Sequence, residues 1–223
     1  MSKAFLFDMD GLLLDTERVY RDAFFDVTSL LGCAKASDRV FFDGLVGSSS
    51  AYTEAALRAY LPESIGLGPF MSEWYAACDR RLAGGVPVKP TVRGVLQNLH
   101  DQGAVMAVVT SSASAHAHDH LDRAGLLAFF HCVTGGDAVS ANKPDPAPYV
   151  ETAQKVGFAP SDCVAFEDSD RGITAAVRAG CTSFQIPDLR PPAQPLPALG
   201  QYVAKDLLSA MRVLNALTGK ALV

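Results

Sequence analysis

The sequence predicts an α/β fold in which a doubly wound parallel sheet of the Rossmann-like type carries an inserted helical domain. Two observations support this prediction. Beyond residue 88, short apolar runs alternate with helical patterns, as is typical of a parallel sheet with crossover helices. Residues 16–87, by contrast, show helical periodicity and no strand pattern. We therefore expect an α/β core formed by residues 1–15 and 88–223, and a small helical cap domain at residues 16–87.

The predicted strands are short and mostly apolar, as expected for strands that helices cover on both faces. They lie at residues 4–7, 104–109, 132–134, 163–166 and 182–186. The predicted helices have apolar residues three and four positions apart, and several are followed by a glycine. Their approximate ranges are residues 16–31, 50–60, 70–82, 92–102, 115–124, 146–156, 172–179 and 206–217. The residues expected to form the core of the helical domain are Phe24, Phe25, Phe41 and Phe42.

The composition is that of a soluble globular protein, with 49% hydrophobic and 19% charged residues. The net charge of −5 argues against nucleic acid or an anionic membrane surface as the main partner. No apolar run approaches the ~18 residues of a membrane span, and the acids that begin at residue 8 leave no room for a signal peptide. The five cysteines are odd in number and form no Cys-x-x-Cys pair, so we expect reduced thiols in a cytoplasmic protein.

Two aspartates directly follow the first predicted strand. Asp8 and Asp10 are two positions apart, so in an extended backbone their side chains point to the same side. Gly11 then allows a sharp turn or the close approach of a ligand. Crowded carboxylates repel one another unless a cation or a proton lies between them. The motif therefore indicates a site for a hard divalent cation such as Mg²⁺, with two solvated acids at a strand end as the simpler alternative.

Hydroxyl groups and a lysine follow later strands. Thr110 and Ser111 come directly after residues 104–109, where a hydroxyl can donate to a phosphate oxygen, although such residues are also ordinary helix N-caps. Lys143 lies in a loop that Pro144 and Pro146 stiffen, which would direct its charge inward. A lysine taken alone would more often be exposed.

A second pair of acids ends the strand at residues 163–166. Glu167 and Asp168 can complete an oxygen-rich metal shell together with Asp8. Ser169 or Asp170 is expected to cap the following helix rather than to bind metal. In a parallel sheet all these positions lie at the same edge.

In this order, the four groups resemble the four motifs of the haloacid dehalogenase-like (HAD) phosphohydrolases, and the resemblance covers the whole chain. The first motif is Asp-Met-Asp-Gly at residues 8–11, followed by Leu-Asp-Thr at residues 14–16. The helical insertion is similar to the small cap of β-phosphoglucomutase-like and phosphoglycolate phosphatase-like members.

The resemblance implies a role for each site residue. Asp8 would attack phosphorus and form an aspartyl-phosphate, and Asp10 would serve as general acid and then as general base. Thr110, Ser111 and Lys143 would bind and stabilise the transferring phosphoryl group. The implied ligands of Mg²⁺ are Asp8, the backbone carbonyl of Asp10, Glu167 and Asp168.

Three other functions fit these residues less well than phosphate-ester hydrolysis does. Dehalogenase relatives attack carbon without a metal, so Asp10 and Asp168 argue against that reaction. A β-phosphoglucomutase-like phosphohexomutase holds a second phosphate with a histidine and an arginine, whereas this chain has Tyr20 and the serines of residues 48–50 there. A non-catalytic phosphometabolite-binding protein would be expected to lack Asp8 or Asp10. We therefore predict a Mg²⁺-dependent phosphatase of a small sugar phosphate or nucleotide-like metabolite.

The residues that select the substrate are the least determined by the sequence. The polar and aromatic candidates in the helical domain are Tyr20, Ser48, Ser49, Tyr52, Trp74 and Arg81. The alternating histidines His116, His118 and His120 could suggest zinc, but only the first and last share a helix face. We interpret this run as a solvated helix face that begins near the site.

Overall fold

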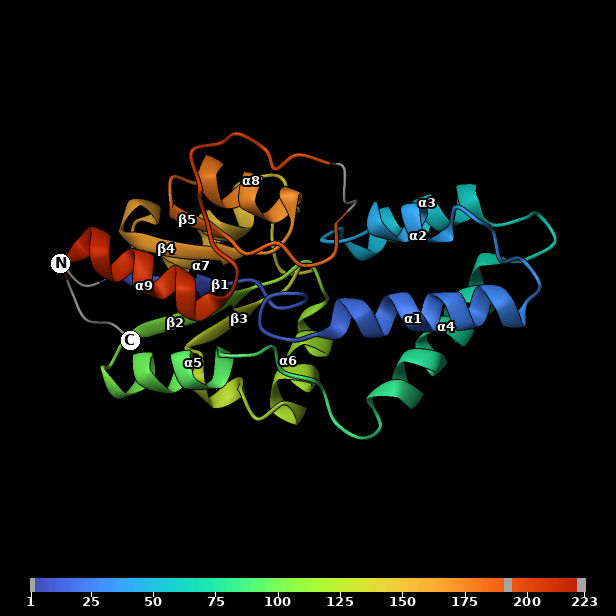
Figure 1. The fold of residues 1–223 in the computed structure, drawn as a ribbon, viewed down its shortest axis with the longest axis horizontal. Coiled ribbons are helices and arrows are strands. Elements are labelled where there is room, and N and C mark those ends of the chain that lie inside the picture. The colour runs from blue at the N-terminus through green and yellow to red at the C-terminus, as the bar shows by residue number, and fades with distance from the viewer. Residues whose placement is uncertain (1–2, 191–193, 220–223) are drawn as a thin grey trace.

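A computed structural model describes residues 3–190 and 194–219, which form an α/β core with a group of helices beside it (Figure 1). The strands are β1 (Ala4–Phe7), β2 (Val105–Val109), β3 (Cys132–Thr134), β4 (Cys163–Glu167), β5 (Thr182–Gln185) and β6 (Tyr202–Val203). The helices are α1 (Thr16–Leu30), α2 (Asp38–Asp43), α3 (Ser50–Tyr60), α4 (Leu67–Leu82), α5 (Val92–Asp101), α6 (Ser114–Arg123), α7 (Ala147–Lys155), α8 (Asp170–Arg178) and α9 (Leu207–Thr218). Short 3₁₀ helices at Leu127–Phe129 and Pro160–Asp162 precede β3 and β4.

The strands form one parallel sheet in the order β3-β2-β1-β4-β5-β6. The order reverses at β1, which makes the sheet doubly wound and places a ligand crevice at the carboxyl end of β1. Phe7 of β1 pairs with both Val108 of β2 and Phe166 of β4. The ends of these three strands therefore lie side by side, and the predicted fold class is confirmed.

Helices cover both faces of the sheet. Phe5 and Phe7 of β1 pack in a cluster with buried residues of α5, α6 and α9. The alternate residues Ala4 and Leu6 pack on the other face against α7 and α8. Burial on both faces explains why the strands read as continuous apolar runs.

The helices α1–α4, here called the helical group, pack around a hydrophobic cluster of their own (Figure 1). Phe24 of α1 is fully buried within it. Its ring centroid lies 5.7–6.0 Å from those of Phe25, Phe41, Phe42, Phe70 and Trp74. The four phenylalanines expected in this core therefore do pack there.

The chain leaves the core and returns to it through adjacent backbone segments. The backbone N–H of Asp15 donates to the carbonyl of Pro87 over 2.8 Å. Lys89 Nζ lies 2.6 Å from an oxygen of Asp188 and 3.3 Å from one of Asp15. This pairing supports the domain boundaries that we propose, between residues 15 and 16 and between residues 87 and 88.

Apart from the two 3₁₀ helices, which were not predicted, the sequence analysis missed one α-helix and one strand and misplaced the start of another helix. Helix α2 is a single short turn and a half with three large apolar residues, which give no readable 3.6-residue period. Strand β6 has two exposed residues at the sheet edge and depends on pairing with β5. Helix α4 begins at Leu67 rather than residue 70, since Pro69 fits the first turn, where no backbone N–H is needed.

No helix in the described ranges is long and apolar enough to cross a membrane. The five cysteines are unpaired thiols, as predicted. Four of them are buried, namely Cys33, Cys78, Cys163 and Cys181.

Candidate active site

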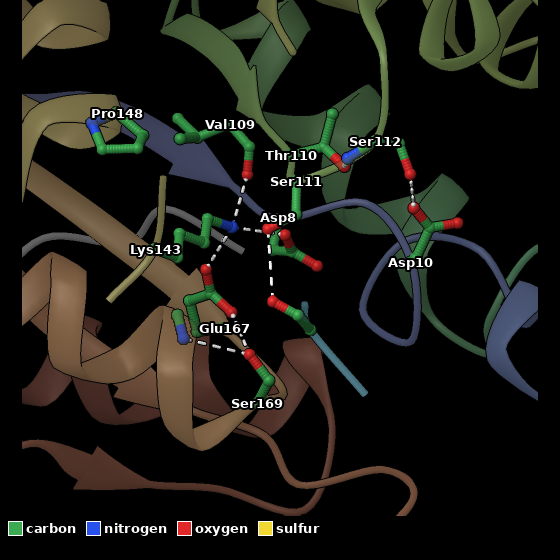
Figure 2. A network of polar contacts seen from close by, with 12 residues as sticks. Asp8, Asp10, Val109, Thr110, Ser111, Ser112, Lys143, Pro148, Glu167 and Ser169 are labelled. Carbon is green, nitrogen blue, oxygen red and sulfur yellow. Dashed lines mark hydrogen bonds and ion pairs between the residues drawn. The ribbon is translucent and has the colours of Figure 1, made fainter. Parts of the chain in front are cut away.

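The ends of β1, β2 and β4 bring the predicted site residues together (Figure 2). Asp8 follows β1, and its backbone N–H donates to the carbonyl of Phe166 in β4 over 3.0 Å. Thr110 follows β2, and Asp168 follows β4. Residues separated by more than a hundred positions thus share one edge of the sheet.

Lys143 lies at the centre of a buried ion-pair cluster (Figure 2). Its Nζ donates to Asp8 Oδ1 over 2.6 Å, to Glu167 Oε1 over 2.6 Å, and to the carbonyl oxygen of Val109 over 2.8 Å. Burial alone would lower the pKa of this ammonium, but the carboxylates of Asp8 and Glu167 raise it. Lys143 is therefore a fixed positive charge and is only 5% exposed.

Asp8, Glu167 and Asp168 form a group of three buried carboxylates, with one oxygen of each within 4.8 Å of the others. Burial first, and then the neighbouring Glu167, raises the pKa of Asp8 well above its ordinary value. Burial and then Asp8 raise the pKa of Asp168 in the same way. Among the described residues, Lys143 is the one cationic side chain paired with this group, and it compensates a single negative charge.

The carboxylate group fits a hard divalent cation. Oδ2 of Asp168 is buried and has no hydrogen-bond partner within the described chain, although such atoms are rarely left unpaired. Oxygen donors in this number and charge are those that Mg²⁺ and Ca²⁺ take. Asp8, Glu167 and Asp168 could therefore hold such an ion.

Two glycines permit this crowding of acids. At Gly172, near the beginning of α8, a Cβ atom would lie 1.9 Å from Glu167 Oε2. At Gly11, where φ is +85°, a Cβ would lie 2.3 Å from Asp168 Oδ2. Ser169 caps α8, because its Oγ accepts the N–H of Gly172 over 3.0 Å.

Asp10 lies apart from the three-carboxylate group, on the side of the helical group (Figure 2). Thr16 Oγ1 donates to its Oδ1 over 2.5 Å, and Ser112 Oγ donates to its Oδ2 over 2.8 Å. The hydroxyl of Tyr20 lies 3.5 Å from the same Oδ1. These hydroxyl groups hold the carboxyl group of Asp10 in place away from the three acids, so any contact of Asp10 with a metal would be made by its backbone carbonyl.

The three hydroxyl residues after β2, at positions 110–112, each contact a different part of the site. Thr110 is buried, and its Oγ1 accepts the N–H of Ser112 over 3.1 Å. Ser111 Oγ donates to the carbonyl of Gly47 over 3.2 Å, which joins the core to the helical group. The sequence analysis did not select Ser112 as a site residue, although its position in the same run was a usable signal. It is the residue of this run that contacts Asp10.

A cavity of about 470 Å³ opens between the two catalytic candidates Asp8 and Asp10 and the helical group. Of the predicted specificity residues, Tyr20, Ser48 and Trp74 line it. The others have different contacts, since Ser49 caps α3, Tyr52 stacks against Arg171, and Arg81 pairs with Asp26.

The interpretation of the histidine run as a solvated face is wrong for His120, whereas His116 and His118 are exposed as predicted. His116 and His120 line the cavity, and His120 is only 2% exposed. The Tyr20 hydroxyl lies 2.9 Å from His116 Nε2 and 3.4 Å from His120 Nδ1. Burial, and then His116, lowers the pKa of His120 to about 4, so this imidazole is neutral. Helix α6 faces the cavity because it starts directly after the site loop.

Glu17 is a buried acid of the cavity wall that the sequence analysis missed. Its Oε1 accepts the backbone N–H of Gly47 over 3.5 Å. Burial, and then the charge of Asp10, raises its pKa from the ordinary 4.5 to about 8. The signal available in the sequence was its spacing of three from Tyr20, which puts both side chains on one helix face.

Comparison with known proteins gives one consistent group. The family model for haloacid dehalogenase-like hydrolases matches residues 5–186. The fructose-1-phosphate phosphatase YqaB of Escherichia coli is 33% identical, over 81% of this chain and 94% of its own. A phosphoglycolate phosphatase of Vibrio parahaemolyticus is 28% identical over 94% of each chain. A crystal structure from Haemophilus somnus, named as a predicted phosphoglycolate phosphatase, shares the fold with a TM-score of 0.82 at 22% identity, covering 96% and 98% of the two chains.

Replacing Glu17 with glutamine should change the pH dependence of stability in metal-free protein. The folded state keeps this proton up to about pH 8, whereas the unfolded chain releases it near the ordinary pKa of 4.5. The folded state therefore binds more protons in this window, so its stability is full below the window and falls by about 1.4 kcal/mol per pH unit across it. Glu17→Gln should lose this slope and be the more stable form near pH 8.

Urea unfolding with EDTA, measured at several pH values, tests this expectation. The control is Glu73→Gln, which alters an exposed glutamate of α4 and should leave the slope as in the wild type. An unchanged slope in Glu17→Gln would contradict the proposed burial of a protonated acid.

Proposed function

The chain belongs to the haloacid dehalogenase-like hydrolase family and is a phosphoric monoester hydrolase, and we propose that it hydrolyses a small phosphorylated sugar or nucleotide-like metabolite with Mg²⁺. The observation that carries this proposal is the position of Asp8. Its carboxylate lies beside the buried ammonium of Lys143 and two further acids, and Asp10 is held nearby at the wall of the same cavity.

In the proposed first step, an oxygen of Asp8 attacks phosphorus, the bond to the leaving oxygen breaks, and an aspartyl-phosphate forms. Lys143 compensates negative charge as the phosphoryl group transfers. Thr110 Oγ1 accepts a bond from the Ser112 backbone, which leaves its proton available to donate to a phosphoryl oxygen. Ser111 would contribute to the same anion site at the end of β2.

Asp10 would transfer the protons. It would protonate the leaving oxygen in the first step and take a proton from water in the second, in which water attacks phosphorus, the bond from phosphorus to the Asp8 oxygen breaks, and inorganic phosphate is released. The hydrogen bonds from Thr16 and Ser112 fix the direction of its carboxyl group. This is the geometry that a general acid needs if it is to reach one atom of the substrate.

We further propose that Asp8, Glu167, Asp168 and the carbonyl of Asp10 hold the Mg²⁺ ion. When bound, the ion would neutralise charge on the phosphoryl oxygens. The unpartnered oxygen of Asp168 supports this assignment. Glu167 Oε1 accepts from Lys143 and from the Tyr149 hydroxyl, and these hydrogen bonds fix the orientation of the carboxylate that would bind the ion.

The phosphohexomutase alternative has less support. A mutase must keep hold of a bisphosphate while it turns over, which calls for a cation away from the reacting phosphate. At the corresponding places this chain has the Tyr20 hydroxyl and the serines of residues 48–50.

We also propose a cytoplasmic location, because the five cysteines are unpaired thiols.

Asp8→Asn should lower phosphate release by at least about 1,000-fold, because the amide cannot act as the nucleophile while the fold keeps a polar group of the same size. Phosphate release from sugar phosphates, nucleotides and phosphoglycolate, with circular dichroism as the check on folding, measures this. Asp101→Asn, an exposed position on α5, is the control and should behave as the wild type. Activity of folded Asp8→Asn within about tenfold of the wild type would exclude the mechanism.

Asp168→Asn should have opposite effects on the metal-free and the metal-bound protein. Removal of one of three crowded charges should raise the melting temperature in EDTA. The same change should weaken Mg²⁺ binding at least about tenfold and reduce the stabilisation that Mg²⁺ gives. Calorimetric titration with Mg²⁺ and thermal unfolding measure the two effects. Wild-type Mg²⁺ affinity in this variant would remove Asp168 from the metal site.

A further inference from the structure

The cavity beyond the catalytic carboxylates has no fixed positive charge. None of the described residues that line it is a lysine or an arginine. Lys143 is withdrawn behind Asp8 by its ion pairs, and the neighbouring His120 is neutral. The wall instead includes the acidic side chain of Asp79 and the buried carboxyl group of Glu17, whose raised pKa of about 8 keeps it protonated below that pH. A second anionic group on the substrate would therefore lose its hydration without gaining a cationic partner in this wall.

The same wall is rich in neutral polar groups. Hydroxyls from α1, from α3 and from the loop before α3 line the cavity, and they belong to Tyr20, Ser48, Ser50 and Thr53. Ser48 Oγ and Thr53 Oγ1 bond to each other over 2.8 Å, and Tyr20 bonds to His116. Hydroxyl and imidazole groups both donate and accept, so they suit a ligand that bears hydroxyls.

The remaining wall is apolar, and it limits the size of the leaving group. Phe42, Leu45 and Trp74 close the cavity on the side of the helical group. A volume of about 470 Å³ is within the range of small-molecule sites. The space suits one monosaccharide-sized or smaller group next to the phosphate.

From these three features we propose that the enzyme selects phosphomonoesters whose leaving group is an uncharged, hydroxylated carbon chain or ring, and rejects those with a carboxylate or a second phosphate. The inference rests on the proposed function, because it assumes that the phosphate binds at Asp8. It separates sugar and polyol monophosphates from phosphoglycolate-like and bisphosphate substrates. Specificity of this kind arises from the repulsion of the wrong ligand as much as from contacts to the right one.

Two pairs of matched esters test the selection. Glycerol 1-phosphate and 3-phosphoglycerate differ by a hydroxymethyl group against a carboxylate, and fructose 1-phosphate and fructose 1,6-bisphosphate differ by one phosphate. Near pH 8, where imidazoles are generally neutral, kcat/KM should favour the member of each pair whose leaving group is uncharged, namely glycerol 1-phosphate and fructose 1-phosphate, by about 100-fold. Equal kcat/KM values, or a preference for the ester whose leaving group is charged, would overturn the proposal and leave the phosphatase activity standing.

A charge placed in the wall should reverse part of this preference. Ser48→Arg introduces a cation at the cavity, so it should raise kcat/KM for the ester with the charged leaving group, relative to its partner, by at least about tenfold. Ser64→Arg, at an exposed position outside the cavity lining, is the matched control and should keep the wild-type ratio. Because an arginine at Ser48 could disturb the loop, Ser50→Arg repeats the test from the beginning of α3. Unchanged ratios in both folded variants would argue against charge selection by this wall.

Binding of the intact esters to Asp8→Asn separates this inference from the proposed function. Calorimetry should show tighter binding of the ester whose leaving group is uncharged, without turnover. If the wild type hydrolyses no ester while this binding preference is found, the proposed function fails and the selection by charge stands. If Asp8→Asn binds both members of each pair equally, the selection fails, whatever the wild type hydrolyses.

Discussion

Charge balance at the end of β1 is the constraint on which the site depends. Three carboxylates and one ammonium share a volume from which water is largely excluded, and each buried charge must be compensated. Lys143 compensates one, which leaves an excess of negative charge that the raised pKa values of Asp8 and Asp168 also express. A site in this state takes up protons or a divalent cation, and the proposed binding of a phosphate ester beside Asp8 would require such neutralisation.

The fold supplies this cluster through strand order rather than through sequence proximity. β1 lies between β2 and β4, so the residues that follow three strands meet at one edge. The strands can carry acids there because their own residues are buried on both faces and hold the backbone rigidly. Close packing then requires glycine at positions 11 and 172, where a side chain would occupy the space of the carboxylates.

Local patterns predicted the parts of the molecule that local physics determines. Apolar runs and glycine stops identified five of the strands and most helices, and the strand-end acids identified the edge at which they meet. Lys143 was placed among them by its proline-stiffened loop together with the resemblance, since a lysine alone would more often be exposed. Helix α2 and strand β6 were missed because both are too short to show a period. Glu17 and His120 escaped prediction for another reason, since their burial arises only when α1 and α6 face each other across the cavity.

Helix α1 contacts both Asp10 and the wall of the cavity. Its residues Thr16 and Tyr20, one turn apart, both contact the carboxyl group of Asp10. Tyr20 also bonds to His116 of the core, while its backbone carbonyl accepts from Trp74 Nε1 over 2.9 Å. A displacement of α1 therefore alters the shape of the cavity and the hydrogen bonds of Asp10 together. If Asp10 protonates the leaving group as proposed, recognition of that group and the orientation of its proton donor depend on the same helix, which would tie substrate fit to proton transfer.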